Sequence, residues 1–236
     1  MIIKSLLDND LYKFSMQNAV ITMFPRAKVR YKFINRANTI FPQNFDVLLK
    51  EQINKMSELK ADKEQLNYFQ QISYYLPPTY FDFLRGYRYN PDEVKIEQID
   101  GKLEITIEGY WYRTILWEVP LLALISELYF RQTNQPIWEI SKIKDVAAQK
   151  ANFFAQIGAN FADFGTRRRY SADNHDLIVA TMKENAPKNF VGTSNVYFAY
   201  KYGLTPIGTQ AHEWIMFHAA KYGFLLANKL SLENWV

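Results

Sequence analysis

The stretch Ala159-Asn-Phe-Ala-Asp-Phe-Gly-Thr-Arg167 begins as an apolar, strand-like run and ends in a polar turn. Two later segments, 190–194 and 205–209, repeat this design, and the residues between the three segments have helical patterns over 172–183 and 195–202. Regular alternation of strands and helices predicts a parallel sheet, either open or closed into a barrel. The fold class expected for this part of the chain is therefore α/β.

The first half of the chain has a more mixed pattern, with strands that are expected to pair antiparallel. Segments 93–99 and 102–108 alternate in polarity around Asp100-Gly101, a pair typical of a two-residue hairpin turn. Further segments are expected to form helices over 11–24 and 45–72 and a strand over 28–34. We thus expect an N-terminal α/β domain with antiparallel strands over 1–118, and the first part of an irregular α/β barrel over 119–236.

Composition excludes several classes of protein. With 236 residues, 48% hydrophobic and 22% charged, the chain reads as globular, neither disordered nor membrane-embedded, and a cytoplasmic location is expected. The absence of cysteine excludes disulfides and thiolate sites. A net charge of +4 is dispersed except at Arg167-Arg-Arg169, which is too short for a nucleic-acid surface but suits one small polyanion. We expect no nucleic-acid partner.

Three polar side chains are expected to share one pocket. Ligands bind at the carboxyl ends of parallel strands, and Arg167, Ser194 and His212 each lie at or just after such an end. An arginine there suits a phosphate, because its planar donors match the phosphate oxygens, and Ser171 is a plausible N-cap for the following helix. The alternative is that all three arginines form a solvated strand end and pair with surface acids.

The three histidines have different surroundings in the sequence. His212 stands between a strand-like run and an apolar helix, which favours a general base or a phosphate acceptor, since histidines in general change charge near neutral pH. His175 is expected at the surface, and His218 in the core. The zinc-protease pattern is absent, because Met216 stands where its second histidine would fall.

Four segments together resemble nicotinate phosphoribosyltransferase in order and spacing: Asp10-Leu-Tyr-Lys13, Asp163-Phe-Gly-Thr-Arg-Arg168, Gly192-Thr-Ser-Asn195 and Gly208-Thr-Gln-Ala-His-Glu-Trp214. The resemblance implies an enzyme of NAD salvage. Such an enzyme joins nicotinate to phosphoribosyl pyrophosphate, hydrolyses ATP alongside, and uses Mg²⁺ with both phosphate substrates. It also implies an α/β N-terminal domain beside an irregular barrel, assembled as a homodimer with a shared active site.

The resemblance assigns roles to individual residues. His212 is similar to the histidine that ATP phosphorylates, and Arg167 to a phosphate contact. Phe164 and Tyr12 resemble the two rings that sandwich the pyridine, with Tyr12 contributed across the dimer interface, and Thr209 resembles a residue close to nicotinate. The alternative for both rings is ordinary core packing.

Ser194 bears on substrate choice. In the related nicotinamide-using enzymes an acidic side chain stands at this position, where it accepts the amide N–H and would repel nicotinate. A serine hydroxyl can donate, so the sequence favours nicotinate over a nicotinamide-specific relative.

Members of this family are longer than 236 residues. The resemblance implies that the remaining barrel strands, a further arginine and acid, and glycine-rich turns for the ribose phosphate lie outside this sequence. Alternatives to an active transferase are a catalytically incomplete fragment that binds a pyridine or forms a dimer, and an unrelated barrel enzyme acting on a phosphorylated metabolite.

Overall fold

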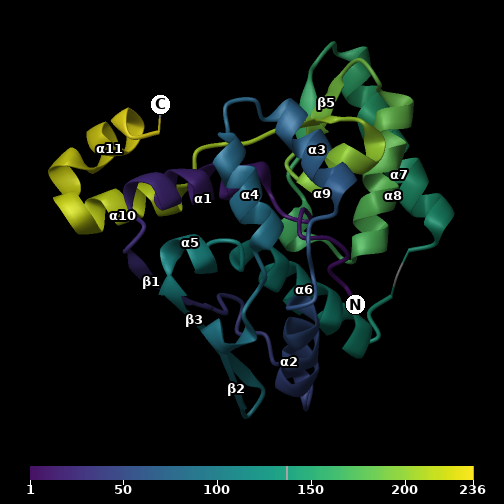
Figure 1. Cartoon of the computed structure of the whole chain (residues 1–236). Coiled ribbons are helices and arrows are strands. Elements are labelled where there is room, and N and C mark those ends of the chain that lie inside the picture. Colours follow the sequence, from purple (N-terminus) through teal and green to yellow (C-terminus); the bar gives the residue numbers. More distant parts are fainter. Residues whose placement is uncertain (137, 236) are drawn as a thin grey trace.

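The computed structural model describes residues 1–136 and 138–235, and its strands form two three-stranded sheets with helices packed around them (Figure 1). Val236, the last residue of the expected second domain, lies outside the described residues. The elements up to residue 132 are α1 (Leu11–Met23), β1 (Lys28–Lys32), α2 (Phe45–Met56), α3 (Lys63–Ile72), α4 (Pro78–Gly86), η1 (Pro91–Glu93), β2 (Val94–Ile99), β3 (Lys102–Tyr110), α5 (Trp111–Thr114) and α6 (Glu118–Gln132).

The first sheet is antiparallel, with strand order β1-β3-β2. Ile99 pairs with Lys102 across the turn, so the predicted hairpin at Asp100-Gly101 is confirmed. Both turn residues have positive φ, 49° at Asp100 and 74° at Gly101, as the favoured two-residue turn requires. This sheet lies below α5 and to the left of α2 in Figure 1.

The single helix expected over 45–72 is wrong. The structure has two helices there, α2 and α3, with a non-helical connection between them. The Asp62 side chain accepts a hydrogen bond from the backbone N–H of Gln65 at 2.8 Å and so caps the start of α3. The N-cap competes with helix continuation, because the side chain satisfies a backbone donor that a longer helix would otherwise satisfy.

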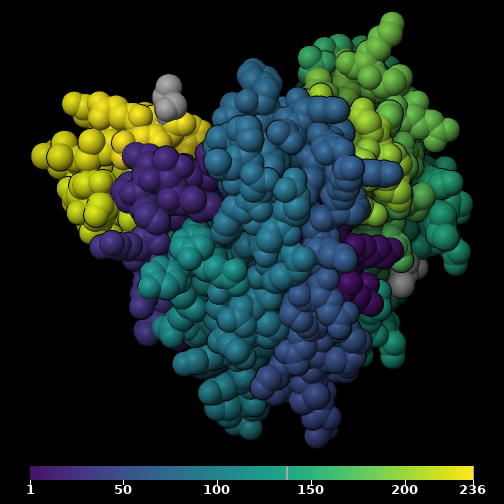
Figure 2. All heavy atoms as spheres, in the orientation of Figure 1, coloured from purple at the N-terminus to yellow at the C-terminus, as the bar shows by residue number. Residues whose placement is uncertain are grey.

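Helix α6 carries much of the main hydrophobic core. Pro120 lies in its first turn, where the missing backbone N–H costs no helical hydrogen bond. The core also includes the fully buried Trp111, Trp117 and Trp214, so α10 packs on the same core as the N-terminal helices. Figure 2 shows the C-terminal helices beside the N-terminal helix on one flank of the molecule.

The second sheet is parallel, with strand order β4-β5-β6, and this confirms the α/β prediction. The elements after residue 139 are α7 (Ile140–Gln156), β4 (Phe161–Asp163), η2 (Thr166–Arg168), α8 (Ala172–Asn185), β5 (Phe190–Thr193), α9 (Val196–Tyr202), β6 (Thr205–Pro206), α10 (His212–Tyr222) and α11 (Phe224–Glu233). Among residues 1–136 and 138–235, every helix is too short or too polar to cross a lipid bilayer.

The strand predicted over 159–167 is shorter than expected, since β4 ends at Asp163 and Arg167 lies in η2. The Asp163 side chain accepts the backbone N–H of Gly165 at 3.0 Å, which turns the chain out of the sheet two residues after the strand. The turn at Gly165 therefore separates the arginines from the strand itself.

The N-terminal segment crosses the carboxyl end of β5. Asp10 forms an antiparallel bridge with Asn195, and the backbone N–H of Leu11 donates to the carbonyl of Ser194 at 2.8 Å. The backbone N–H of Val196 donates to the carbonyl of Asn9 at 3.0 Å. These bonds fix the start of α1 at the edge where a ligand of a parallel sheet is expected.

Candidate functional site

Arg167 and Phe164 follow β4 and are both accessible. Residue Phe164 is 48% exposed, and the Arg167 side chain is half-buried. The Arg167 Nη1 donates to Oε1 of Glu118, in the first turn of α6, at 2.9 Å. Arg168 is exposed. The guanidinium of Arg167 is thus held from one side and open on the other.

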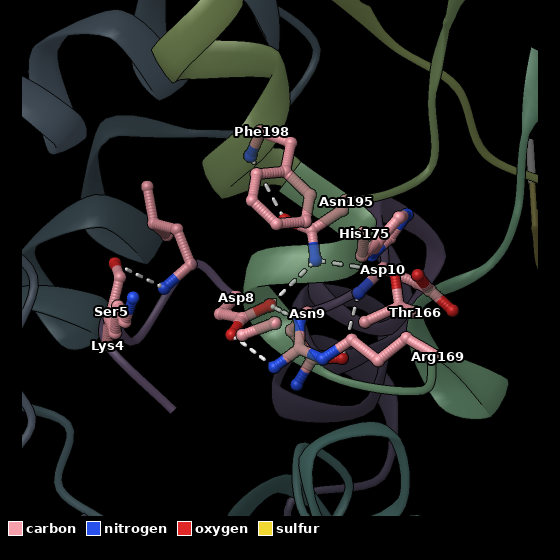
Figure 3. A network of polar contacts seen from close by, with 12 residues as sticks. Lys4, Ser5, Asp8, Asn9, Asp10, Thr166, Arg169, His175, Asn195 and Phe198 are labelled. Atoms are coloured by element: carbon pink, nitrogen blue, oxygen red, sulfur yellow. Dashed lines mark hydrogen bonds and ion pairs between the residues drawn. The ribbon is translucent and has the colours of Figure 1, made fainter. Parts of the chain in front are cut away.

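Arg169 forms a buried ion pair with Asp8 (Figure 3). Its two terminal nitrogens donate to the two carboxylate oxygens at 2.7 and 2.8 Å, and Asn195 Nδ2 donates to the same carboxylate at 2.8 Å. The alternative that all three arginines are a solvated strand end is therefore wrong for Arg169, because the N-terminal segment supplies a buried partner.

His175 is buried, so the expectation of a surface residue is wrong. Its Nε2 lies 2.8 Å from Oδ2 of Asp163, which also accepts the hydroxyl of Thr193 at 2.6 Å. Burial raises the pKa of Asp163, but hydrogen bonds and charge from His175 and the bond from Thr193 outweigh it, so the pKa is lowered. The ionised Asp163 carboxylate therefore stabilises the turn that contains Phe164.

Ser171 caps α8 as predicted, since its Oγ accepts the backbone N–H of Asn174.

Ser194 lies beneath the surface. It is fully buried, and its Oγ donates to Oδ1 of Asp10 at 2.8 Å. Burial raises the pKa of Asp10, and the bond from Ser194 only partly opposes that rise. In this structure the Ser194 hydroxyl forms its hydrogen bond within the protein, and its contact with nicotinate stays a prediction.

Tyr12 and the loop before α10 lie close together. Tyr12 is largely buried, and burial raises the pKa of its phenol to about 12. A Cβ added at Gly208 would lie 3.6 Å from the backbone nitrogen of Tyr12, so this loop packs directly on the start of α1. Thr209, the next residue, is exposed.

His212 is exposed at the first position of α10, and Glu213 follows it. Both line a cavity of about 1300 Å³ together with Glu118. The Lys13 Nζ lies between the two carboxylates, 2.5 Å from Oε2 of Glu118 and in direct contact with Oε2 of Glu213. Because Glu118 also holds Arg167, a continuous chain of ion pairs joins the arginine to the start of α10.

Sequence reasoning missed Lys13, Glu118 and Glu213 as members of this site. One signal was available: Lys13 is the only charged residue in α1, whose early turns are otherwise apolar or neutral. A lone buried ammonium needs carboxylate partners, but their positions 105 and 200 residues further on could not be read from spacing. His218 is buried, as expected. The described residues hold no group of three or more His, Cys, Asp or Glu placed for a metal.

Comparisons with known proteins agree with the fold. Residues 7–126 match the model of the nicotinate phosphoribosyltransferase N-terminal domain, and residues 159–236 match the model of the nicotinate phosphoribosyltransferase family. The nicotinate phosphoribosyltransferase of Chromohalobacter salexigens is 49% identical over 98% of this chain, and that of Desulforapulum autotrophicum is 44% identical over 99%. The chain spans 60% of the length of each of these relatives.

Two solved structures are similar along the whole chain. The crystal structure of nicotinate phosphoribosyltransferase from Porphyromonas gingivalis has a TM-score of 0.95 and 40% identity, covering 99% of this chain and 60% of that one. The enzyme from Vibrio cholerae has a TM-score of 0.90 and 31% identity, covering 100% of this chain and 57% of that one. Because the two family models match successive parts of the chain, the chain belongs to the nicotinate phosphoribosyltransferase family.

Proposed function

We propose that the chain carries the pyridine- and phosphate-binding part of a nicotinate phosphoribosyltransferase, which joins nicotinate to phosphoribosyl pyrophosphate to give nicotinate mononucleotide and pyrophosphate. The relatives bear this name. The observation that carries the proposal is local: an accessible aromatic ring and an accessible guanidinium, Phe164 and Arg167, follow the same strand at the carboxyl end of a parallel sheet. Nicotinate has a flat ring and phosphoribosyl pyrophosphate has anionic phosphates, so one side chain of each kind suits these two substrates.

The transfer itself is a substitution at the anomeric carbon of the ribose. The pyridine nitrogen forms the new C–N bond, and the C–O bond to pyrophosphate breaks, with the electron pair leaving on pyrophosphate as its Mg²⁺ complex. Phe164 would stack on the pyridine, and Arg167 would bind phosphate oxygens and oppose the charge that grows on them. Their rigid placement after β4 would hold the reacting groups in line.

The proposal includes ATP coupling through His212. An imidazole nitrogen attacks the γ-phosphorus of ATP, a P–N bond forms, the P–O bond to ADP breaks, and the ring loses a proton. The exposed position of His212 at the start of α10, beside the large cavity, is suited to this transfer. We also propose that two copies assemble with a shared site to which Tyr12 contributes across the interface, and that Thr209 lies near nicotinate.

Pyrophosphate release tests the function. The purified protein, with phosphoribosyl pyrophosphate, ATP and Mg²⁺, is expected to release pyrophosphate when nicotinate is added, and much more slowly with the same concentration of nicotinamide. If calorimetry shows that nicotinate binds but no pyrophosphate is released, the proposed transferase activity is overturned. That result would favour a binding module. Equal rates with both pyridines would overturn the preference for the acid.

Phe164→Leu is expected to raise the KM for nicotinate. Leucine keeps an apolar side chain but loses the ring face, and aromatic pairs contribute about 0.5–1.5 kcal/mol beyond the area they bury, which corresponds to roughly 2- to 10-fold in KM. The measurement is initial-rate kinetics with varied nicotinate, and Phe153→Leu, at an exposed ring on α7, is the matched control. If both variants keep the KM of the parent, Phe164 does not stack on the pyridine.

Ser194→Asp is expected to weaken nicotinate binding by about tenfold or more, because like charges repel strongly where water is excluded. The new carboxylate would lie beside Asp10, whose carboxylate now accepts the Ser194 hydroxyl. Ser194→Asn, similar in size but neutral, is the control and should bind nicotinate better than the aspartate variant. A KM for nicotinate unchanged in Ser194→Asp would show that this position does not face the substrate.

A further inference from the structure

Lys13 is a fully buried ammonium held between two carboxylates. Its side chain is 0% exposed, and its Nζ contacts Oε2 of both Glu118 and Glu213. Burial alone would lower the pKa of Lys13, but the charges of Glu213 and Glu118 outweigh it and raise the pKa above its usual value. Lys13 is therefore a positively charged side chain in the interior at neutral pH.

The other oxygen of each carboxylate, Oε1, also accepts hydrogen bonds, and the donors differ between Glu118 and Glu213. Glu118 Oε1 accepts from Arg167, the proposed anion contact. Glu213 Oε1 accepts from the phenol of Tyr31 at 2.5 Å and from the indole N–H of Trp111 at 2.6 Å. The bond to Glu118 fixes the guanidinium of Arg167. The two bonds to Glu213 fix the turn of α10 that begins with His212.

The charges of this network cancel. Two cations, Arg167 and Lys13, face two carboxylates, Glu118 and Glu213, so the cluster is neutral as a whole. Without the ammonium, one guanidinium would face two carboxylates, and the excess negative charge would lie beside a cavity that both carboxylates line. Excess negative charge at that place opposes any anion, because buried charges are poorly screened.

We propose that Lys13 is a positioning residue that couples the anion contact Arg167 to the phosphate-accepting end of α10 through Glu118 and Glu213. The proposal rests on the function proposed above. Lys13 draws Glu118 toward itself, so that Arg167 keeps donors free for a phosphate, and it anchors Glu213, so that His212 keeps its place at the cavity. Binding of an anion at one end of the network thus affects the charge balance at the other end.

Lys13→Met tests the proposal, because methionine fills similar space without the charge. We expect the KM for phosphoribosyl pyrophosphate to rise about tenfold with kcat changed less than about threefold, since the one uncompensated carboxylate charge opposes the anion. The double variant Lys13→Met/Glu213→Gln restores a neutral cluster and is expected to recover most of the KM. Lys4→Met, the same substitution at an exposed ion pair with Asp173, is the matched control.

A role limited to filling space predicts parent-like kinetics for Lys13→Met and no gain in the double variant, and that result would overturn the proposal. If Lys13→Met does not fold, Glu118→Gln decides: it leaves Lys13 paired with Glu213 and frees Arg167, so the KM for phosphoribosyl pyrophosphate should fall. A rise would contradict the proposal. If the parent releases no pyrophosphate, the proposed function fails, and calorimetry with Mg²⁺-pyrophosphate still tests whether Lys13→Met weakens anion binding.

Discussion

His212→Asn is expected to abolish both ATP hydrolysis and the gain of one phosphate that ATP gives the parent protein, while slow ATP-independent transfer persists. An asparagine amide has similar size but no nucleophilic nitrogen, because its lone pair is delocalised into the carbonyl. Intact-mass spectrometry after incubation with Mg²⁺-ATP measures the gain directly. The added mass should disappear in acid, since a P–N bond to imidazole is acid-labile.

The other two histidines make this test specific. His175 is buried against Asp163, and the Nδ1 of buried His218 lies 2.8 Å from the carbonyl of Trp214. Of the three histidines in the sequence, His212 is thus the exposed one. A phosphate gain that survives in His212→Asn would place the modification on another residue and remove His212 from the proposed coupling.

Asp8→Asn is expected to destabilise the fold by about 3–5 kcal/mol, because it leaves the buried guanidinium of Arg169 without a countercharge. For a protein of this size the unfolding midpoint should fall by on the order of 10 °C. Thermal unfolding followed by circular dichroism measures the change. The control is Lys4→Met, which removes an ion pair whose side chains are 56% and 79% exposed and should shift the midpoint by only about 1–2 °C.

The same pair should make the parent sensitive to acid. Burial raises the pKa of Asp8, but charge and hydrogen bonds from Arg169 outweigh it, so the folded pKa lies below the usual 3.8. Because the folded pKa is depressed, this stabilisation is fully present above pH 3.8 and is lost as the pH falls through the folded value. Denaturation of Asp8→Asn should therefore depend less on pH in that acidic range than denaturation of the parent, and equal slopes would contradict the assignment.

Local chemistry made several parts of the fold predictable from the sequence. Asp100-Gly101 tolerates the two positive φ angles of its turn, and Ser171 supplies a cap oxygen to a helix that begins at the next residue. In both cases the controlling residue and its effect lie within a few positions of each other. The parallel sheet was predictable for a related reason, since alternating strand and helix patterns leave few ways to connect the strands.

Polar contacts between distant residues could not be predicted in the same way. Whether an arginine is solvated or buried depends on a partner from another segment. Arg169 pairs with Asp8, which lies 161 residues earlier in the sequence. His175 was expected at the surface because acidic residues flank it, but in the fold its ring in α8 lies against Asp163, the last residue of β4. In the proposed site, the sequence identified residues next to strand ends and missed the buried charges that hold them.

The N-terminal segment at the end of β5 has a consequence for biosynthesis. Asp8 precedes Arg169 by 161 residues and Asn195 by 187, and the ribosome makes the chain from its N-terminus. Until residues 169 and 195 have been made, the Asp8 carboxylate has neither partner and stays hydrated. Docking of the N-terminal segment onto the carboxyl end of β5 therefore has to wait until residue 195 has been made.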